Sequence, residues 1–241
     1  QKNIINLLRC AWAGSQKYGA LVWSGDIKSS FPSMKNQVAA GLNMGIAGIP
    51  WWTTDIGGFF GANINDPEFH ELLVRWFEYG CFCPVMRLHG YRWPLQPQYG
   101  TTGGATCVSG APNEVWSYTD QVCEILSDYL RLRERMLPYI TELMEEAHEK
   151  GTPVMRPLFY DFPEDKESWN VETEYMFGPK VLVKPITDAD ARETDVYLPG
   201  GASWTNAWTG ETFEGGQKVH VAAPIEQIPL FTRDGYKLPM K

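Results

Sequence analysis

The sequence predicts an α/β barrel segment followed by an all-β domain, and two patterns carry this prediction. Up to Gly151, apolar runs alternate with helical patterns, and polar side chains stand where the apolar runs end. After Gly151, short β-like runs are separated by glycine-rich turns. Strand followed by helix at roughly 30-residue spacing is typical of the parallel strands of a barrel, whereas short strands separated by frequent turns are typical of a sandwich.

The clearest of the apolar runs ends at Asp26. From Tyr18 the run is short and rich in aromatic and β-branched residues, so it predicts a strand, and Ser24 and Gly25 allow the backbone to turn before the carboxylate. Trp23 supplies an apolar wall beside it. Asp26 is therefore a candidate catalytic acid. The alternative is a surface Asp that caps the following helix.

Three other apolar runs end in the same way. The run Ile4 to Leu8 ends in Arg9, the run from Gly45 ends in Asp55 and a glycine pair before Phe59, and the run Cys81 to Met86 ends in Arg87 and His89. Because the carboxyl ends of parallel strands meet on one face of a barrel, we expect these side chains to converge with Asp26.

Ordinary roles remain open for three of these residues. Arg87 is expected either to recognise sugar hydroxyls or to pair with a carboxylate such as Asp55. His89 is expected to bind a sugar hydroxyl, with a structural hydrogen bond as the alternative. Phe59 either stacks on a sugar or plugs the core.

Helical patterns separate the predicted strands. They cover Pro32 to Met44 and Pro67 to Tyr79, where Asp66 and Pro67 form a helix start. A longer pattern runs from Asn113 to His148, with a break expected at Pro138. The Gly-, Pro- and Thr-rich stretch 91–112 predicts a functional loop over the strand ends; a disordered linker is the alternative.

The remainder of the chain predicts strands. These lie at 155–162, 175–178, 181–183, 195–198, 204–208, 218–222 and 228–232. The expected division is therefore a barrel segment at residues 1–151 and a β-sandwich at residues 152–241.

Composition excludes several classes of function. The net charge of −8 and the lack of a basic stripe argue against nucleic-acid binding. No apolar run approaches the ~20 residues of a membrane span. Five cysteines form no cluster with zinc spacing, and no metal or organic cofactor is expected. Ten Trp and eleven Tyr are many for this length. Exposed aromatic faces stack on sugars, whereas a place in the buried core is the alternative and is expected for about two-thirds of them.

Five motifs resemble, in order and spacing, those of glycoside hydrolase family 31, the α-glucosidases and α-xylosidases. They are Arg9-Cys-Ala-Trp-Ala-Gly-Ser-Gln, Trp23-Ser-Gly-Asp26, Asp55-Ile-Gly-Gly-Phe59, Arg87-Leu-His89-Gly90 and Tyr175-Met-Phe-Gly-Pro. The resemblance covers nearly the whole chain. It implies the last strands, roughly the fifth to eighth, of a (β/α)8 TIM barrel, followed by the C-terminal β-sandwich of the family.

The resemblance also implies roles for the site residues. Asp26 matches the general acid/base, while Arg9, Trp23, Asp55, Phe59, Arg87 and His89 match positions that shape the subsite for the non-reducing sugar. The nucleophilic Asp of the family lies on an earlier strand, and no matching motif precedes Arg9. Retaining hydrolysis needs two carboxyl groups about 5 to 5.5 Å apart, so Asp26 supplies half of the pair. Without the nucleophile's charge, and with Arg9 close by, Asp26 is expected to titrate lower.

The sequence therefore predicts a piece of a retaining α-glycoside hydrolase that acts on an oligosaccharide or glycoside. The chain begins at Gln1 within a strand pattern, so its partner is expected to be a missing N-terminal segment of the same polypeptide, and the 241 residues alone are expected to be inactive. Two alternatives stay open: a transglycosylase or α-glucan lyase, and a non-catalytic carbohydrate-binding or structural remnant. The preferred sugar, the oligomeric state and the compartment are not readable.

Overall fold

The computed structural model describes residues 4–240, so Gln1 lies outside the described residues. The first part contains a parallel three-stranded sheet of order β1-β2-β3, built from β1 (Asn6–Leu8), β2 (Ala20–Trp23) and β3 (Trp52–Thr53). A parallel bridge between Ile56 and Leu88 extends the parallel pairing from the segment after β3 to the segment around Leu88. The short strands β4 (Ala62–Asn63) and β5 (Arg92–Trp93) also pair in parallel. Parallel pairing with helical crossovers is the arrangement of a partial α/β barrel.

Four helices follow or connect these strands. They are α1 (Phe31–Ile46), α2 (Pro67–Cys81), α3 (Asp120–Arg135) and α4 (Leu137–Lys150). Asp66 caps α2 through Glu68 N–H, as its sequence predicts, and Gly151 ends α4 in the left-handed conformation. The expected break near Pro138 is confirmed, because α3 stops at Arg135 and Pro138 lies in the first turn of α4. Short 3-10 helices lie at Ser15–Tyr18, Gly103–Thr106 and Val115–Ser117.

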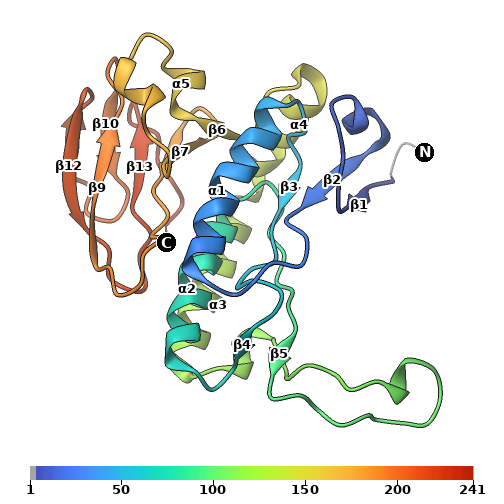
Figure 1. The fold of residues 1–241 in the computed structure, drawn as a ribbon. Coiled ribbons are helices and arrows are strands. Elements are labelled where there is room, and N and C mark those ends of the chain that lie inside the picture. Colours follow the sequence, from blue (N-terminus) through green and yellow to red (C-terminus); the bar gives the residue numbers. More distant parts are fainter. Residues whose placement is uncertain (1–3, 241) are drawn as a thin grey trace.

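The second part is a β-sandwich. One sheet has the order β11-β10-β13-β8-β7-β6, and β12 pairs with β9 in the other. The strands are β6 (Met155–Pro157), β7 (Tyr175–Phe177), β8 (Val181–Val183), β9 (Glu193–Leu198), β10 (Ser203–Asn206), β11 (Thr212–Glu214), β12 (Gln217–Ala222) and β13 (Leu230–Arg233). In Figure 1 the four long helices stand between this sandwich and the β1-β2-β3 sheet.

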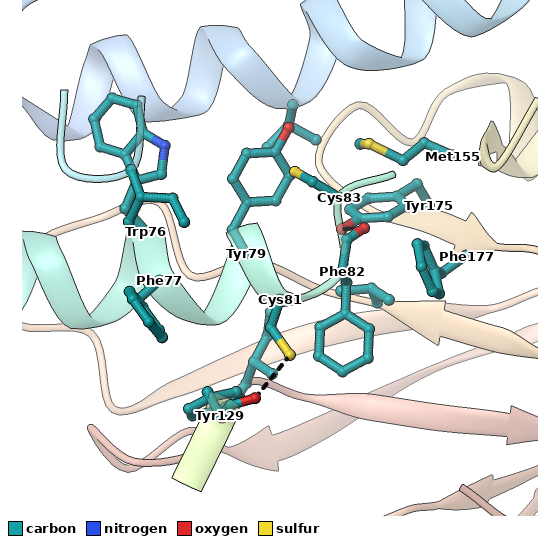
Figure 2. Packing of buried hydrophobic residues seen from close by; sticks show 14 of the residues in the cluster. Trp76, Phe77, Tyr79, Cys81, Phe82, Cys83, Tyr129, Met155, Tyr175 and Phe177 are labelled. Carbon is teal, nitrogen blue, oxygen red and sulfur yellow. Dashed lines mark hydrogen bonds between the residues drawn. The ribbon is translucent and has the colours of Figure 1, made fainter. Parts of the chain in front are cut away.

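The main apolar core crosses the seam between the two parts. Figure 2 shows Phe82 against Phe177 and Tyr79 against Tyr175, with ring centroids 5.9 Å and 6.2 Å apart. The Tyr175 hydroxyl also donates to the Phe82 carbonyl at 3.0 Å. A second core cluster, around Trp204 and Phe231, lies within the sandwich. The seam is therefore packed like a protein interior.

Three predicted strands are wrong in whole or in part. The run Cys81 to Met86 is no strand: Cys81 ends α2 and the following residues turn. The run from Gly45 contributes only Trp52–Thr53, because α1 extends to Ile46. The run from Met155 is a strand only to Pro157, after which Leu158–Asp161 form the short helix α5. In each case the apolar run is short, and a short apolar run does not by itself distinguish a strand from a helix or a turn.

The stretch 91–112 is a folded loop. Gln96 and Ser109 exchange two backbone hydrogen bonds, of 2.9 Å and 3.2 Å, and the stretch projects from the strand ends at the lower right of Figure 1. The disordered-linker alternative is therefore wrong. No helix among residues 4–240 is long and apolar enough to cross a membrane.

Candidate active site

Arg9 and Asp26 come together at the ends of neighbouring strands. Arg9 follows β1 and Asp26 follows the turn after β2, and the Arg9 Nη2 to Asp26 Oδ2 distance is 3.2 Å. Both side chains are accessible, with 65% and 38% of their surfaces exposed. The N-cap of α1 is Ser30, which accepts from Ser33 N–H, so Asp26 does not cap that helix. An accessible carboxylate beside a cation is thus free to meet a ligand.

Trp23 lies between two cations. The guanidinium carbon of Arg9 is 5.8 Å from the Trp23 ring centroid, and that of Arg87 is 5.2 Å away. Both distances fall within the range of a cation–π contact. Trp23 therefore links the end of β2 to Arg9, which follows β1, and to Arg87, which follows the turn after α2.

Asp55 has different surroundings from Asp26. Its side chain is fully buried and forms an ion pair with Arg87, and its N–H donates to Ser24 Oγ at 3.2 Å. Burial raises the pKa of Asp55 to about 6, the nearby charge of Asp26 adds to this, and Arg87 opposes it. The Arg87 to Asp55 pairing is thus the arrangement that the structure adopts. Asp55 supports Arg87 from below the accessible surface.

Three rings stack along the rim of the site. Phe59 stacks on His89 with centroids 5.6 Å apart and on Tyr91 with centroids 6.4 Å apart. Phe59 is half-buried and His89 is exposed. Partial burial, together with the charges of Arg87 and Arg92, lowers the pKa of His89, so its imidazole is neutral near pH 7. No protein hydrogen bond engages the His89 ring within residues 4–240, which argues against the structural alternative.

Two arginines that the sequence did not single out, the buried Arg92 and the half-buried Arg133, hold this arrangement. Arg92 donates to the carbonyls of Ile56 at 3.1 Å and Gly58 at 2.7 Å, and so fixes the backbone before Phe59. Arg133 donates to the carbonyls of Cys81, Cys83 and Pro84 at 2.7 to 2.8 Å, and so fixes the segment that leads to Arg87. Neither residue stands at the end of an apolar run, as the predicted site residues do, so the sequence offered no signal for them.

The arrangement supplies one accessible carboxyl group with cations and rings around it. Asp26 is able to exchange a proton with a ligand, whereas Asp55 has no exposed surface from which to reach one. No group of three or more His, Cys, Asp or Glu side chains in the described part of the chain is arranged to hold a metal ion. Asp26 and Arg9 thus place acid–base and hydrogen-bonding groups at the accessible surface.

Comparisons with known proteins cover both parts of the chain. Residues 1–143 match the family model of the glycosyl hydrolases family 31 TIM-barrel domain, and residues 151–238 match that of the family 31 C-terminal domain. A GH31 alpha-xylosidase from a soil metagenome, solved in complex with xylose, is 55% identical with a TM-score of 0.94 over 99% of this chain and 36% of its own.

Curated relatives are much longer than this chain. An alpha-xylosidase of Saccharolobus solfataricus is 38% identical over 99% of this chain and 30% of its own length. Alpha-glucosidase 2 of Bacillus thermoamyloliquefaciens is 35% identical over 95% of this chain and 26% of its own length. The chain thus spans about a third or less of these relatives.

Proposed function

Because the chain belongs to glycoside hydrolase family 31, we propose that it carries part of the active site of a retaining α-glycoside hydrolase acting on non-reducing-end α-linked sugars. Asp26 is the general acid/base: it protonates the leaving oxygen and later accepts a proton from water. The observation that carries this proposal is the accessible carboxylate of Asp26 at the end of β2, flanked by Arg9 and Trp23.

The other six residues bind or support the non-reducing sugar. Arg9 and Arg87 are the cations beside Trp23, and their guanidinium groups donate to sugar hydroxyls. His89 offers a neutral imidazole, and Phe59 orients it by stacking. Asp55 positions Arg87 through their ion pair. Buried support beneath accessible hydrogen-bonding groups is the arrangement that fixes a small polar ligand.

The nucleophile of this proposal comes from outside residues 4–240. A nucleophilic carboxylate must be ionised and must reach the anomeric carbon, about 5 to 5.5 Å from the acid/base. Asp55 is buried, it faces Arg87, and its pKa is raised to about 6, so it meets neither condition well. A segment of the same polypeptide that supplies this carboxylate would also cover the edge of β1, where Ile5 is 62% exposed.

An α-xyloside is the substrate that the comparisons favour. The soil-metagenome enzyme and the Saccharolobus enzyme are both named alpha-xylosidases, and the former was solved with xylose. The Bacillus relative is named an alpha-glucosidase, so glucose is the second sugar to test.

We place the division between the catalytic barrel segment and the sandwich at residues 151 and 152, in the linker between α4 and β6.

Product analysis with the full-length protein tests the proposal. The full-length protein should release free xylose or glucose, as the α-anomer, from α-xylosyl or α-glucosyl disaccharides. An anhydro-sugar would indicate a lyase, and longer oligosaccharides would indicate a transglycosylase. The 241-residue chain expressed alone should be inactive and self-associate through β1. Sugar binding by the full-length protein without any turnover would support the non-catalytic alternative.

A further inference from the structure

The loop after His89 is anchored rigidly at its root. We define the arm as residues Tyr91–Ala111. Arg92 lies at its base with no exposed surface, and the Ala111 N–H donates to the Arg92 carbonyl at 2.9 Å, which closes the two ends of the arm on each other. A Cβ atom added to Gly110 would lie 2.9 Å from the Arg92 nitrogen, so only glycine permits this approach.

The outer part of the arm is also structured. Tyr99 N–H and Gly100 N–H both donate to the Ala105 carbonyl, at 3.1 Å and 3.0 Å. Cys107 N–H donates to the Gly104 carbonyl at 3.1 Å. These bonds hold the backbone on either side of Tyr99, whose side chain is nevertheless 76% exposed. A large exposed ring on a hydrogen-bonded loop is a ready surface for a ligand.

The arm encloses a hollow next to the site. Its volume is about 400 Å³, within the range of small-molecule pockets. Its lining includes Gly90, Tyr91, Tyr99, Gly104, Cys107 and Ser109. The two tyrosines supply aromatic faces, and the glycines leave backbone polar groups uncovered. This combination of ring faces and hydrogen-bonding groups suits a sugar ring.

The hollow shares one residue, Tyr91, with the aromatic rim of the candidate active site. Tyr91 lines the hollow and also stacks on Phe59, which in turn stacks on His89. Tyr91 N–H donates to the Phe59 carbonyl at 2.6 Å, so the two residues keep their positions relative to each other. A ligand that extends beyond His89 therefore meets Tyr91 and then the hollow.

We propose that the arm forms a second sugar subsite, in which Tyr91 and Tyr99 bind the ring of the leaving group. This inference rests on the proposed function, because a leaving-group subsite exists only where a glycosidic bond is cleaved beside it. Tyr99 sets the preference for extended substrates, and Tyr91 joins this subsite to the one for the non-reducing sugar.

The test compares two substrates that share the non-reducing sugar in the full-length protein. A glycosyl fluoride has no leaving-group ring, whereas the matching disaccharide has one. Tyr99→Ala should lower kcat/KM for the disaccharide about three- to tenfold and change that for the fluoride less than twofold. Tyr99→Phe, which keeps the ring, should stay near wild type. Gln98→Ala is the matched control, because Gln98 is an exposed neighbour that does not line the hollow.

Different outcomes separate the two proposals. If the wild-type protein cleaves both substrates and Tyr99→Ala affects them equally or not at all, the arm subsite is wrong and the proposed function stands. If the wild-type protein cleaves neither the xylosyl nor the glucosyl substrates, the proposed function fails and the subsite fails with it.

Discussion

The Arg9–Asp26 pair at the strand ends and the Arg75–Glu78 pair at the seam use the same two chemical groups in opposite surroundings. The first pair is 65% and 38% exposed, whereas neither side chain of the second has any exposed surface. Arg75 also donates to the carbonyls of Ala191, Ala223, Pro224 and Gln227 in the sandwich. The exposed Arg9–Asp26 pair has donors and acceptors that are not used within the protein, whereas the buried Arg75–Glu78 pair has almost none.

Tyr129 completes the buried pair. Its hydroxyl donates to Glu78 Oε1 at 3.1 Å and accepts from Ile228 N–H at 3.0 Å. Burial raises the pKa of Glu78 to about 8 even though Arg75 lies against it. Exposed ion pairs contribute little to stability, whereas removing one partner of a buried pair leaves the other group enclosed without its hydrogen-bond partner. The comparison teaches that the same two groups leave a carboxylate accessible to a ligand in one pair and bond the helices to the sandwich in the other.

The largest expected effect is on catalysis at the exposed pair. Asp26→Asn in the full-length protein should lower kcat/KM on an α-linked disaccharide by roughly 10² to 10⁴, the usual contribution of a general acid. The thermal midpoint should change little, because the Arg9–Asp26 pair is exposed. Asp128→Asn is the matched control, since Asp128 forms an exposed pair with Arg131 away from the site. Unchanged rates in the Asp26 variant would eliminate its assignment.

The next largest effect is on stability at the buried pair. Arg75→Met should destabilise the protein by about 3 to 5 kcal/mol, because Glu78 and four sandwich carbonyls lose their donor. Urea and thermal midpoints measure this loss. Arg131→Ala should change stability by no more than about 0.5 kcal/mol. A loss below about 1 kcal/mol for Arg75→Met would show that the enclosed pair does not join the domains.

A smaller effect is expected at His89. His89→Ala should weaken binding of a monosaccharide by about 1 to 3 kcal/mol, because a sugar hydroxyl loses a directional partner. The thermal midpoint should change less than the affinity. His148→Ala, on the exposed end of α4, is the control. Unaltered affinity together with a large fall in the midpoint would favour a structural role for His89.

The strand ends were predictable because each carries a local signal. At Arg9, Asp26 and Asp55, an apolar run that stops at a charged residue correctly predicts a parallel strand with a polar group after its end, and the structure places Arg9 beside Asp26. Arg87 lies beside Asp55 although its own run is no strand. The helix starting at Pro67 was equally predictable, since its cap and proline lie within a few residues. Roles in binding and catalysis remain predictions.

Features that depend on distant contacts were not predictable. Arg75 bonds to carbonyls more than a hundred residues away, and Arg92 fixes backbone before Phe59. Nothing in their local sequence distinguishes them from solvated arginines. The wrong strand at Cys81 to Met86 has the same cause. Arg133 and Tyr175 satisfy the carbonyls that a strand would pair in a sheet.

The last expected effect concerns Asp55, which has features of both pairs: it lies in the site but is fully buried. Its pKa is about 6 in the folded protein against an ordinary value of 3.8. The folded state therefore holds the proton more tightly. The stability this contributes is fully present below about pH 4 and is lost as pH rises through about 6, at no more than about 1.4 kcal/mol per pH unit.

Unfolding midpoints of wild type and Asp55→Asn between pH 4 and pH 7 test this sign. The stability of wild type relative to the variant should fall as the pH rises, because only wild type must ionise a buried carboxyl group at this position. Glu78 titrates in both proteins, so its contribution cancels in the difference. A relative stability that instead rises with pH would mean that the charge of Arg87 outweighs burial. Asp55 would then be the ionised partner of Arg87, and its exclusion as the nucleophile would rest on its lack of exposed surface alone.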